Sequence, residues 1–402
     1  MARKQLAEIF KKPESGEWGE EDLTGNGVNV LRTTNFTDTG VIDYNDVVKR
    51  KLDIEKLHNK WLRVGDIIIE KSGGSEIKPV GRVVYFTGKE NEYVFNNFTS
   101  VLRDRCKDSV DSRYVFFHLL NLYRKRGTVR YSNRTTGIHN LKLSMFLNNE
   151  SVELIEIDKQ KEKVLSLDLL INVINRRKQQ LVDLDNLIKS RFVEMFGDPV
   201  SNPKGWETRL LGDVLRGKPS NGFFAKNTEY TIDGDSSVMW IVDIVNRMYS
   251  NIDCTKRINA KDEDVKKYSV QYGDLLFCRS SLNVDGIGKA SMVPKNVKPR
   301  TLFECHIIRI PLDMSVCLPE FIQILTTTVG FRNQIMSKAN TATMTTINQD
   351  GICSNKIYIP PLFLQNQFAD FVQQVDKSKV VIQKSLDETQ ELFDCLMQKY
   401  FG

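Results

Sequence analysis

Apolar residues recur at alternating spacings of three and four along residues 158–196, a segment that contains no Pro or Gly. This spacing places an apolar stripe along one face of a long helix. A second stripe of the same phase follows about 205 residues later. The apolar stripe positions are Leu167, Leu170, Ile174, Leu181, Leu184, Ile188 and Met195 in the first segment and Val372, Val375, Ile382, Leu386, Phe393, Leu396 and Tyr400 in the second. A lone stripe is typical of a helix packed on its own domain, but two matching stripes favour an antiparallel coiled coil.

The remaining sequence also contains an internal repeat, with a period of 205 to 208 residues. Residues 64–68 (VGDII), for example, recur as residues 272–276 (YGDLL). In each copy, strand-like runs separated by turn-forming residues precede a helical segment. The strand-like runs span 28–36, 66–70, 82–86 and 98–102 in the first copy, with 238–244 as a counterpart in the second, and the helical segments span 112–123 and 320–327.

These patterns predict a mixed α/β fold class (α+β), in which two pseudo-repeated modules are separated by two long helices that form an antiparallel coiled coil. The clearest boundary is the turn-rich segment Gly197–Trp206, which follows the first long helix. The predicted parts are a first module over 1–150, a central helical spacer over 151–197, a second module over 198–360 and a C-terminal helical spacer over 361–402.

Composition excludes several classes of protein. The 402 residues carry a formal net charge of +6, which suits a polyanionic partner but is too small to identify one. No apolar run is long enough to cross a membrane, so we expect a cytoplasmic protein without a membrane partner. The seven cysteines form no C-x-x-C pair, and only His306 adjoins a cysteine. We therefore expect reduced thiols and no metal site.

No segment of the sequence predicts a reaction. Asp66 and Glu70, followed by Lys71, resemble the acid pair of metal-dependent nucleases, but the second copy has Cys278 in place of the glutamate. Residues 286–291 resemble part of a phosphate-binding loop, yet Asn283 stands where the first glycine is needed. We predict no catalytic residue and no metal ligand, and a stand-alone nuclease ranks last among the hypotheses.

Two loops in each copy combine cations with short hydrogen-bonding side chains, a composition that suits DNA. Arginine pairs with guanine, asparagine with adenine, and threonine contacts phosphate or a thymine methyl group. The candidate DNA-binding residues are Lys71, Ser72, Arg82, Arg130, Asn133, Arg134, Thr135 and Thr136 in the first copy and Arg279, Ser280, Asn283, Lys289, Lys338, Asn340, Thr341 and Thr343 in the second. The alternative is a coiled-coil scaffold with two protein-binding modules and no nucleic acid, although such surfaces are usually aromatic and apolar.

Three segments carry a resemblance to a known family. They are Leu184–Pro199, Ile359–Ala369, and Gly205–Glu207 followed by Leu210–Val214. Together they resemble the specificity subunits of Type I restriction-modification systems, and the resemblance covers nearly the whole chain. It departs from symmetry at one point, because Ile359–Leu362 contains two prolines and the matching Leu154–Ile157 contains none. The sequence therefore leaves open how the chain enters the first long helix.

The resemblance implies that each module is a target-recognition domain that reads one half of a bipartite, asymmetric sequence in double-stranded DNA. It implies that the helices set the spacing and dock two modification (methyltransferase) subunits, which methylate adenine after flipping it from the duplex. Restriction (motor-nuclease) subunits would join for cleavage. S-adenosylmethionine, ATP and Mg are expected on these partner subunits and no cofactor on this chain, which would be a non-catalytic subunit rather than an enzyme.

Overall fold

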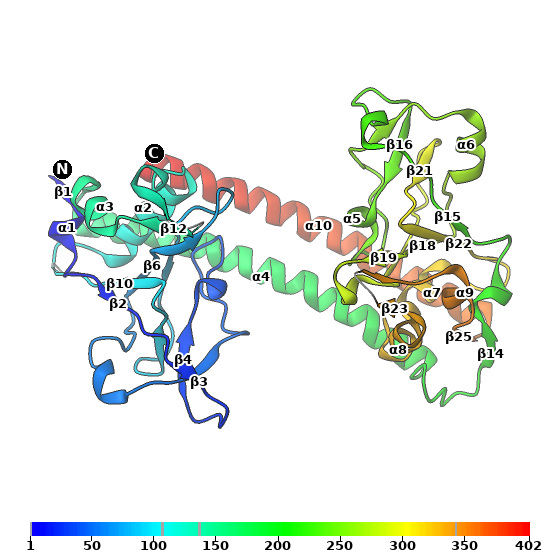
Figure 1. Ribbon diagram of the computed structural model, residues 1–402, viewed down its shortest axis with the longest axis horizontal. Helices are drawn as coiled ribbons and strands as arrows, with labels where there is room; N and C mark the ends of the chain where they lie inside the picture. Colours follow the sequence, from blue (N-terminus) through cyan, green and yellow to red (C-terminus); the bar gives the residue numbers. More distant parts are fainter. Residues whose placement is uncertain (1, 106–107, 136–137, 342–343) are drawn as a thin grey trace. The chain divides into compact units, whose positions relative to one another are not determined.

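The computed structural model describes residues 2–105, 108–135, 138–341 and 344–402, which fold into two compact units (Figure 1). The first unit comprises Met1–Lys178 and Lys384–Gly402, and the second comprises Gln179–Gln383. Each unit contains one mixed module and about half of each of two 40-residue helices. These helices are α4 (Ile157–Phe196) and α10 (Leu362–Phe401), so the two long helices predicted from the apolar stripes are confirmed.

The first module contains two four-stranded sheets, one three-stranded sheet and one strand pair. Their strand orders are β2-β10-β6-β8, β3-β5-β4-β9, β11-β12-β7 and β1-β13. The strands are β1 (Ala2–Gln5), β2 (Glu14–Ser15), β3 (Glu20–Glu21), β4 (Val28–Leu31), β5 (Val48–Lys51), β6 (Ile67–Glu70), β7 (Ser72–Gly74), β8 (Val83–Tyr85), β9 (Tyr93–Phe95), β10 (Thr99–Leu102), β11 (Ser132–Thr135), β12 (Ile138–Leu141) and β13 (Ser151–Leu154). The helices are α1 (Leu6–Ile9), α2 (Ser112–Arg124) and α3 (Leu143–Asn149), with 3-10 turns η1 (Thr33–Asn35), η2 (Ile54–Leu57) and η3 (Val129–Tyr131).

The second module repeats this topology, with strand orders β15-β22-β18-β20, β17-β16-β21, β19-β24-β23 and β14-β25. The strands are β14 (Glu207–Leu210), β15 (Ser220–Asn221), β16 (Ser236–Met239), β17 (Arg257–Ile258), β18 (Asp274–Cys278), β19 (Ser280–Ser281), β20 (Ala290–Met292), β21 (Thr301–Phe303), β22 (Ile307–Pro311), β23 (Asn340–Thr341), β24 (Thr345–Thr346) and β25 (Lys356–Ile359). The helices are α5 (Ile241–Ile244), α6 (Asp262–Tyr268), α7 (Pro319–Thr327), α8 (Val329–Lys338) and α9 (Gln349–Cys353), with η4 (Leu211–Val214), η5 (Asn227–Glu229) and η6 (Val284–Gly286). Both modules also pair one strand in parallel, β4 with β9 and β16 with β21, so the predicted internal repeat is confirmed.

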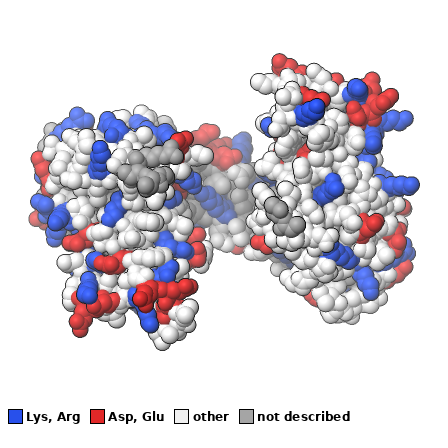
Figure 2. Space-filling model, in the orientation of Figure 1, with Lys and Arg blue, Asp and Glu red and all other residues white. Residues whose placement is uncertain are grey.

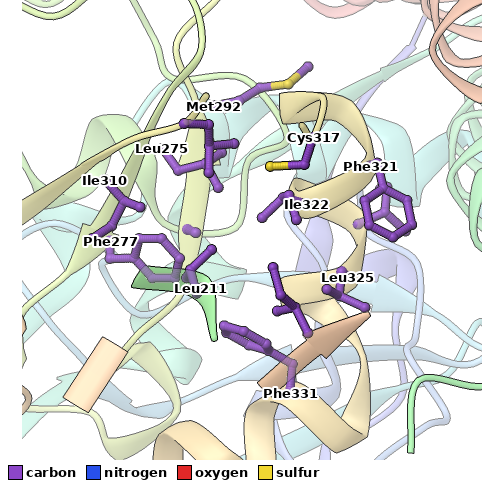
Figure 3. Packing of buried hydrophobic residues seen from close by; sticks show 14 of the residues in the cluster. Leu211, Leu275, Phe277, Met292, Ile310, Cys317, Phe321, Ile322, Leu325 and Phe331 are labelled. Atoms are coloured by element: carbon purple, nitrogen blue, oxygen red, sulfur yellow. The ribbon is translucent and has the colours of Figure 1, made fainter. Parts of the chain in front are cut away.

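The central strand of each larger sheet explains why the core forms where it does. All residues of β6 and β18 are buried, and their apolar runs Ile67–Ile69 and Leu275–Cys278 suit strands that are covered on both faces. In the second module, Leu275 and Phe277 of β18 face the side chains of α7 (Figure 3). Phe321 and Leu325 of α7 belong to the same buried cluster. The rigid sheet thereby fixes the loops that leave its strands.

The apolar stripes serve both of the roles that the sequence suggested. In the second unit, the Phe192 ring lies 5.6 Å from Phe368 of α10 and 5.4 Å from Phe321 of the module. Lys379 Nζ also pairs with Asp185 Oδ1 at 2.6 Å. In the first unit, Lys163 Nζ of α4 lies 4.9 Å from the Tyr400 ring of α10. The residue numbers of the contacts therefore rise along α4 while they fall along α10. The two helices are antiparallel, as predicted.

One predicted strand is shorter than expected. The run 28–36 forms β4 only to Leu31 and then turns into η1. Asn35, which is 1% exposed, accepts a hydrogen bond from Arg32 N at 2.8 Å and donates one to Asp43 O at 2.9 Å. Such a side chain offers the backbone an alternative to the strand ladder. In the counterpart run, Asp243 accepts from Trp240 N at 2.9 Å, and the strand likewise ends early.

Within the described residues, no helix combines the length and the apolar character that a membrane crossing requires. The six described cysteines, which exclude Cys106, are all free.

Candidate nucleic-acid interface

In the first module, the two predicted DNA-binding loops come together in one three-stranded sheet. Ser72 begins β7, and its Oγ donates a hydrogen bond of 2.7 Å to Asn140 Oδ1 on β12. Asn133 on β11 lies opposite Asn140 in the ladder, and His139 lies opposite Gly74. Loops about 60 residues apart in sequence thus form one polar surface.

The second module builds the same surface from different residues. Ser280 of β19 pairs with Thr346 of β24, which in turn pairs with Asn340 of β23. On the neighbouring positions, the hydroxyl groups of Thr341 and Thr345 lie 3.2 Å apart. The same strand order therefore presents serine, asparagine and histidine in one module and serine, asparagine and threonine in the other.

Several cations near these sheets are held by neighbouring residues, and all of them except the exposed Arg130 are partly buried. Lys71 Nζ donates to Ser15 Oγ, and burial lowers the pKa of Lys71 below its usual value. Arg130 forms an ion pair with Glu150. In the second module, Arg279 Nη1 donates to Cys305 O at 3.3 Å. Lys338 Nζ donates to Asn355 Oδ1 at 3.1 Å, and burial lowers the pKa of Lys338.

Like the cations just described, three further candidate residues lie outside the strands of the two small sheets. Arg82 donates to the carbonyl oxygens of Thr33 at 2.7 Å and Phe36 at 3.1 Å, so its guanidinium group braces η1. Lys289 Nζ donates to Asn246 Oδ1 at 2.6 Å. Asn283 Oδ1 accepts from Asp285 N at 3.0 Å and caps η6. These contacts support neighbouring segments of the modules.

The last candidates lie at or beyond the edge of the described chain. Arg134 and Thr135 belong to β11 and lie opposite His139 and Ile138 in the ladder. Thr136 and Thr343 fall outside the described residues.

Surface charge alone does not mark the interface. Figure 2 shows Lys and Arg spread over the visible face of both units, with Asp and Glu among them. This distribution agrees with the small net charge of +6. The identity of the side chains on the two small sheets is therefore more informative than the overall field.

The acid pair noted in the sequence, Asp66 and Glu70, is bound by two different arginines. Arg103 Nε and Nη2 bind the two oxygens of Asp66 at 2.9 and 2.8 Å, which leaves the aspartate in a buried ion pair. Asp274, its counterpart, is fully buried and pairs with Arg216. Each aspartate also accepts a backbone N–H of the turn before its strand. These contacts give both aspartates a structural role.

Sequence reasoning missed the middle strand of each small sheet. His139 and Asn140 in the first module and Thr345 and Thr346 in the second lie between the strands that carry the candidates. Only the pairing pattern shows which residues form the central strand, because adjacent polar pairs such as His139 and Asn140 carry no strand periodicity in the sequence.

Comparison with known proteins gives one sequence relative and several structural neighbours. No family model matches the chain. The specificity subunit of the Type I restriction enzyme EcoKI from Escherichia coli K12 is 22% identical over 394 residues, which cover 94% of this chain and 81% of that protein. This similarity confirms the resemblance to Type I specificity subunits.

Two solved structures confirm the fold of Type I specificity subunits for this chain. The S subunit of a Type I restriction-modification system from M. genitalium aligns over 100% of this chain and 96% of its own length, with a TM-score of 0.57 and 13% identity. A chain from a structure that describes complex assembly and conformational transition of the type I R-M system aligns over 100% and 97%, with a TM-score of 0.52 and 15% identity.

One group of potential metal ligands exists among the residues that the structure describes. Ligand atoms of Glu304, Cys305 and His306 lie within 4.8 Å of one another. Glu304 Oε2 accepts hydrogen bonds from His306 N at 2.9 Å and lies 2.7 Å from His306 Nδ1. These bonds close the turn between β21 and β22, so the structure accounts for the group without an ion.

Proposed function

We propose that this chain is the DNA-specificity subunit of a Type I restriction-modification complex, in which each module reads one half of a bipartite, asymmetric target in double-stranded DNA. The chain itself would be non-catalytic. Two methyltransferase subunits would dock on the helices and carry S-adenosylmethionine, and restriction subunits with ATP and Mg would join for cleavage. This proposal extends to this chain what the name of its EcoKI relative says of that protein.

The proposal rests on one observation, namely that the two modules share a strand order but present different side chains on it. Both modules order the strands of their small sheets alike, yet the matched positions Glu70 and Cys278, or Gly74 and Leu282, differ in chemistry. A repeated frame gives each module the same way of lying against DNA, while different side chains select different bases. Two such modules suit a target whose halves differ in sequence.

The two long helices suit a spacing role. A 40-residue helix is about 60 Å long, which matches the rise of about 18 base pairs of duplex. The pairing of Asp185 with Lys379 and of Phe192 with Phe368 stiffens the helices within the second unit. A stiff spacer of this length would allow two half-sites separated by a fixed number of unread base pairs.

The first test is methylome sequencing of a host that expresses the chain with its partner methyltransferase subunits. We expect one bipartite motif methylated on adenine. Absence of any such motif in cells that contain the assembled complex would refute the proposal.

A salt titration of DNA binding separates this function from that of a protein scaffold. Cation contacts to phosphate release counterions, so the affinity should fall steeply as the salt concentration rises. A flat response would favour the scaffold.

A further inference from the structure

A hollow of about 440 Å³ lies in the first module beside β7, the strand that begins with Ser72. Thr33 and Thr34 of η1 line it, as do Gly73 and Gly74 of β7. Glu70, the last residue of β6, also lines it, although only 4% of the residue is exposed. A carboxylate thus lies recessed in a hollow that adjoins the candidate DNA surface.

The surroundings hold this carboxylate in one orientation at the wall of the hollow. Gly73 has a φ of +109°, which favours glycine, and a Cβ atom there would lie 3.9 Å from Glu70 Oε1. Arg82 Nε lies 3.4 Å from Glu70 Oε2, while its terminal nitrogens are held by Thr33 O and Phe36 O. Arg82 therefore fixes the carboxylate from one side, and on the side of Gly73 no side chain stands between Glu70 Oε1 and the hollow.

The second module has different chemistry at the matched positions. Cys278 replaces Glu70 and is fully buried, and its thiol faces Ser280 O at 3.5 Å. The counterparts of Gly74 and Thr34 are the exposed apolar residues Leu282 and Val242. The first module thus offers a hydrogen-bond acceptor where the second offers apolar side chains, which suit a thymine methyl group.

We propose that Glu70 is a specificity-determining residue of the first module, and that its carboxylate accepts a hydrogen bond from the exocyclic amino group of a base. At pH 8, above the value of about 7 to which burial raises the pKa of Glu70, the carboxylate is ionised and is an acceptor only. In the major groove only cytosine N4 and adenine N6 carry amino groups, whereas guanine and thymine present carbonyl oxygens there and are rejected. The contact is direct or bridged by one water, as in many protein–DNA interfaces.

This inference rests on the proposed function, since it requires that β7 faces DNA. The test uses the complex with its partner methyltransferase subunits and duplexes that carry the methylated motif. Each adenine or cytosine of the half-site read by the first module is replaced in turn by purine or 2-pyrimidinone, which lack the amino group. For the wild-type chain, one replacement should weaken binding roughly ten-fold or more. Whether purine or 2-pyrimidinone has this effect identifies the base.

Two variants separate recognition from folding. In Glu70→Met, which has no acceptor, the same replacement should no longer change the affinity. In Glu70→Gln, which keeps the shape of the side chain, the complex should also accept guanine or thymine at that position, because the amide can donate. Glu55→Met, at an exposed glutamate of η2, is the matched control and should behave as the wild type.

The outcomes are distinguishable. In one outcome, the wild-type complex reads a bipartite motif, but the substitutions at position 70 do not change the effect of any amino-group deletion. Glu70 is then a structural residue, and the inference is wrong while the function stands. If the wild-type complex produces no motif, the proposed function itself fails.

Discussion

Gln160 and Gln365 stand 205 residues apart and make the same three hydrogen bonds, both with fully buried side chains. Gln160 Oε1 accepts from Asp111 N at 3.0 Å, and its Nε2 donates to Ser109 O at 3.2 Å and Ile155 O at 2.7 Å. Asp111 caps α2, so this amide ties the start of the long helix α4 to the start of the module helix.

Gln365 repeats the arrangement in the second unit. Its Oε1 accepts from Leu318 N at 2.8 Å, and its Nε2 donates to Val316 O at 3.3 Å and Pro360 O at 2.7 Å. The prolines that precede α10 are therefore not needed to direct the chain into the helix, because Ile155 supplies the equivalent carbonyl before α4. The course of the chain that the sequence left open is fixed by a glutamine.

The first prediction concerns this glutamine. Gln160→Ala should lower the free energy of unfolding by about 2–4 kcal/mol, because it leaves one buried N–H and two carbonyl groups without their partner. Chemical denaturation measures the change. Gln180→Ala, at an exposed position of the same helix, is the control and should cost less than about 0.5 kcal/mol. Equal effects of the two substitutions would contradict the assigned role.

The second prediction concerns the buried pair of Asp66 and Arg103. Asp66→Ala leaves a largely buried guanidinium group without its partner and should cost about 3 kcal/mol or more in stability. The exposed Asp46, which pairs with Arg32, is the matched control, and Asp46→Ala should cost at most about 1 kcal/mol. If the purified chain instead cleaves DNA with a divalent metal, and Asp66→Ala abolishes cleavage without loss of stability, the nuclease hypothesis is restored.

The third prediction concerns pH. Burial raises the pKa of Glu70 to about 7, and the charges of Arg82 and Lys78 oppose this rise only in part. Between about pH 4.5 and 7 the folded chain keeps a proton that the unfolded chain has lost, so stability falls as the pH rises through this window and then levels off. The loss amounts to at most about 3 kcal/mol.

Denaturation of the wild-type chain and Glu70→Gln at pH 5 and pH 8 measures this effect. The difference in stability between the two chains should shift against the wild type at pH 8. Tyr123, whose hydroxyl group also interacts with Glu70, titrates far above this window, since burial raises its pKa from an ordinary value of 10.0. An identical difference at both pH values would show that the pKa of Glu70 is not raised.

The fourth prediction concerns the second module. Arg279 is held at its backbone by His306 O and Ile347 N, which fix its position beside β19. Arg279→Ala should weaken recognition of one half of the motif by about 1–3 kcal/mol and leave the other half unchanged. The methylation pattern of cells with this variant measures the effect. Arg209→Ala, at an arginine paired with Glu207 on β14, is the control. Relaxation of both halves would contradict the assignment.

Much of the architecture could be predicted because it follows from periodicity. The spacing of Leu167 and Leu170, repeated by Val372 and Val375, is a local property of the sequence and predicts both long helices. The repeat of VGDII as YGDLL aligned the two central strands, β6 and β18.

The partners of individual polar residues could not be predicted, because they come from distant parts of the chain. Arg82 has the charge and the hydrogen-bond donors of a DNA-binding residue. Its acceptors, Thr33 and Phe36, nevertheless lie 49 and 46 residues away in the sequence. Glu70 was considered only as a metal ligand, and its hollow exists only because η1 folds beside β7. Single-residue composition does not contain this information.

The central claim is that the two modules read separate half-sites, and a module exchange tests it most directly. Residues 201–359 are replaced by the corresponding segment of another Type I specificity subunit, and the methylome of cells with the hybrid and its methyltransferase partners is sequenced. The account predicts a bipartite motif that keeps one original half-site and acquires a new second half. A hybrid complex that methylates the original motif with both half-sites unchanged would contradict it.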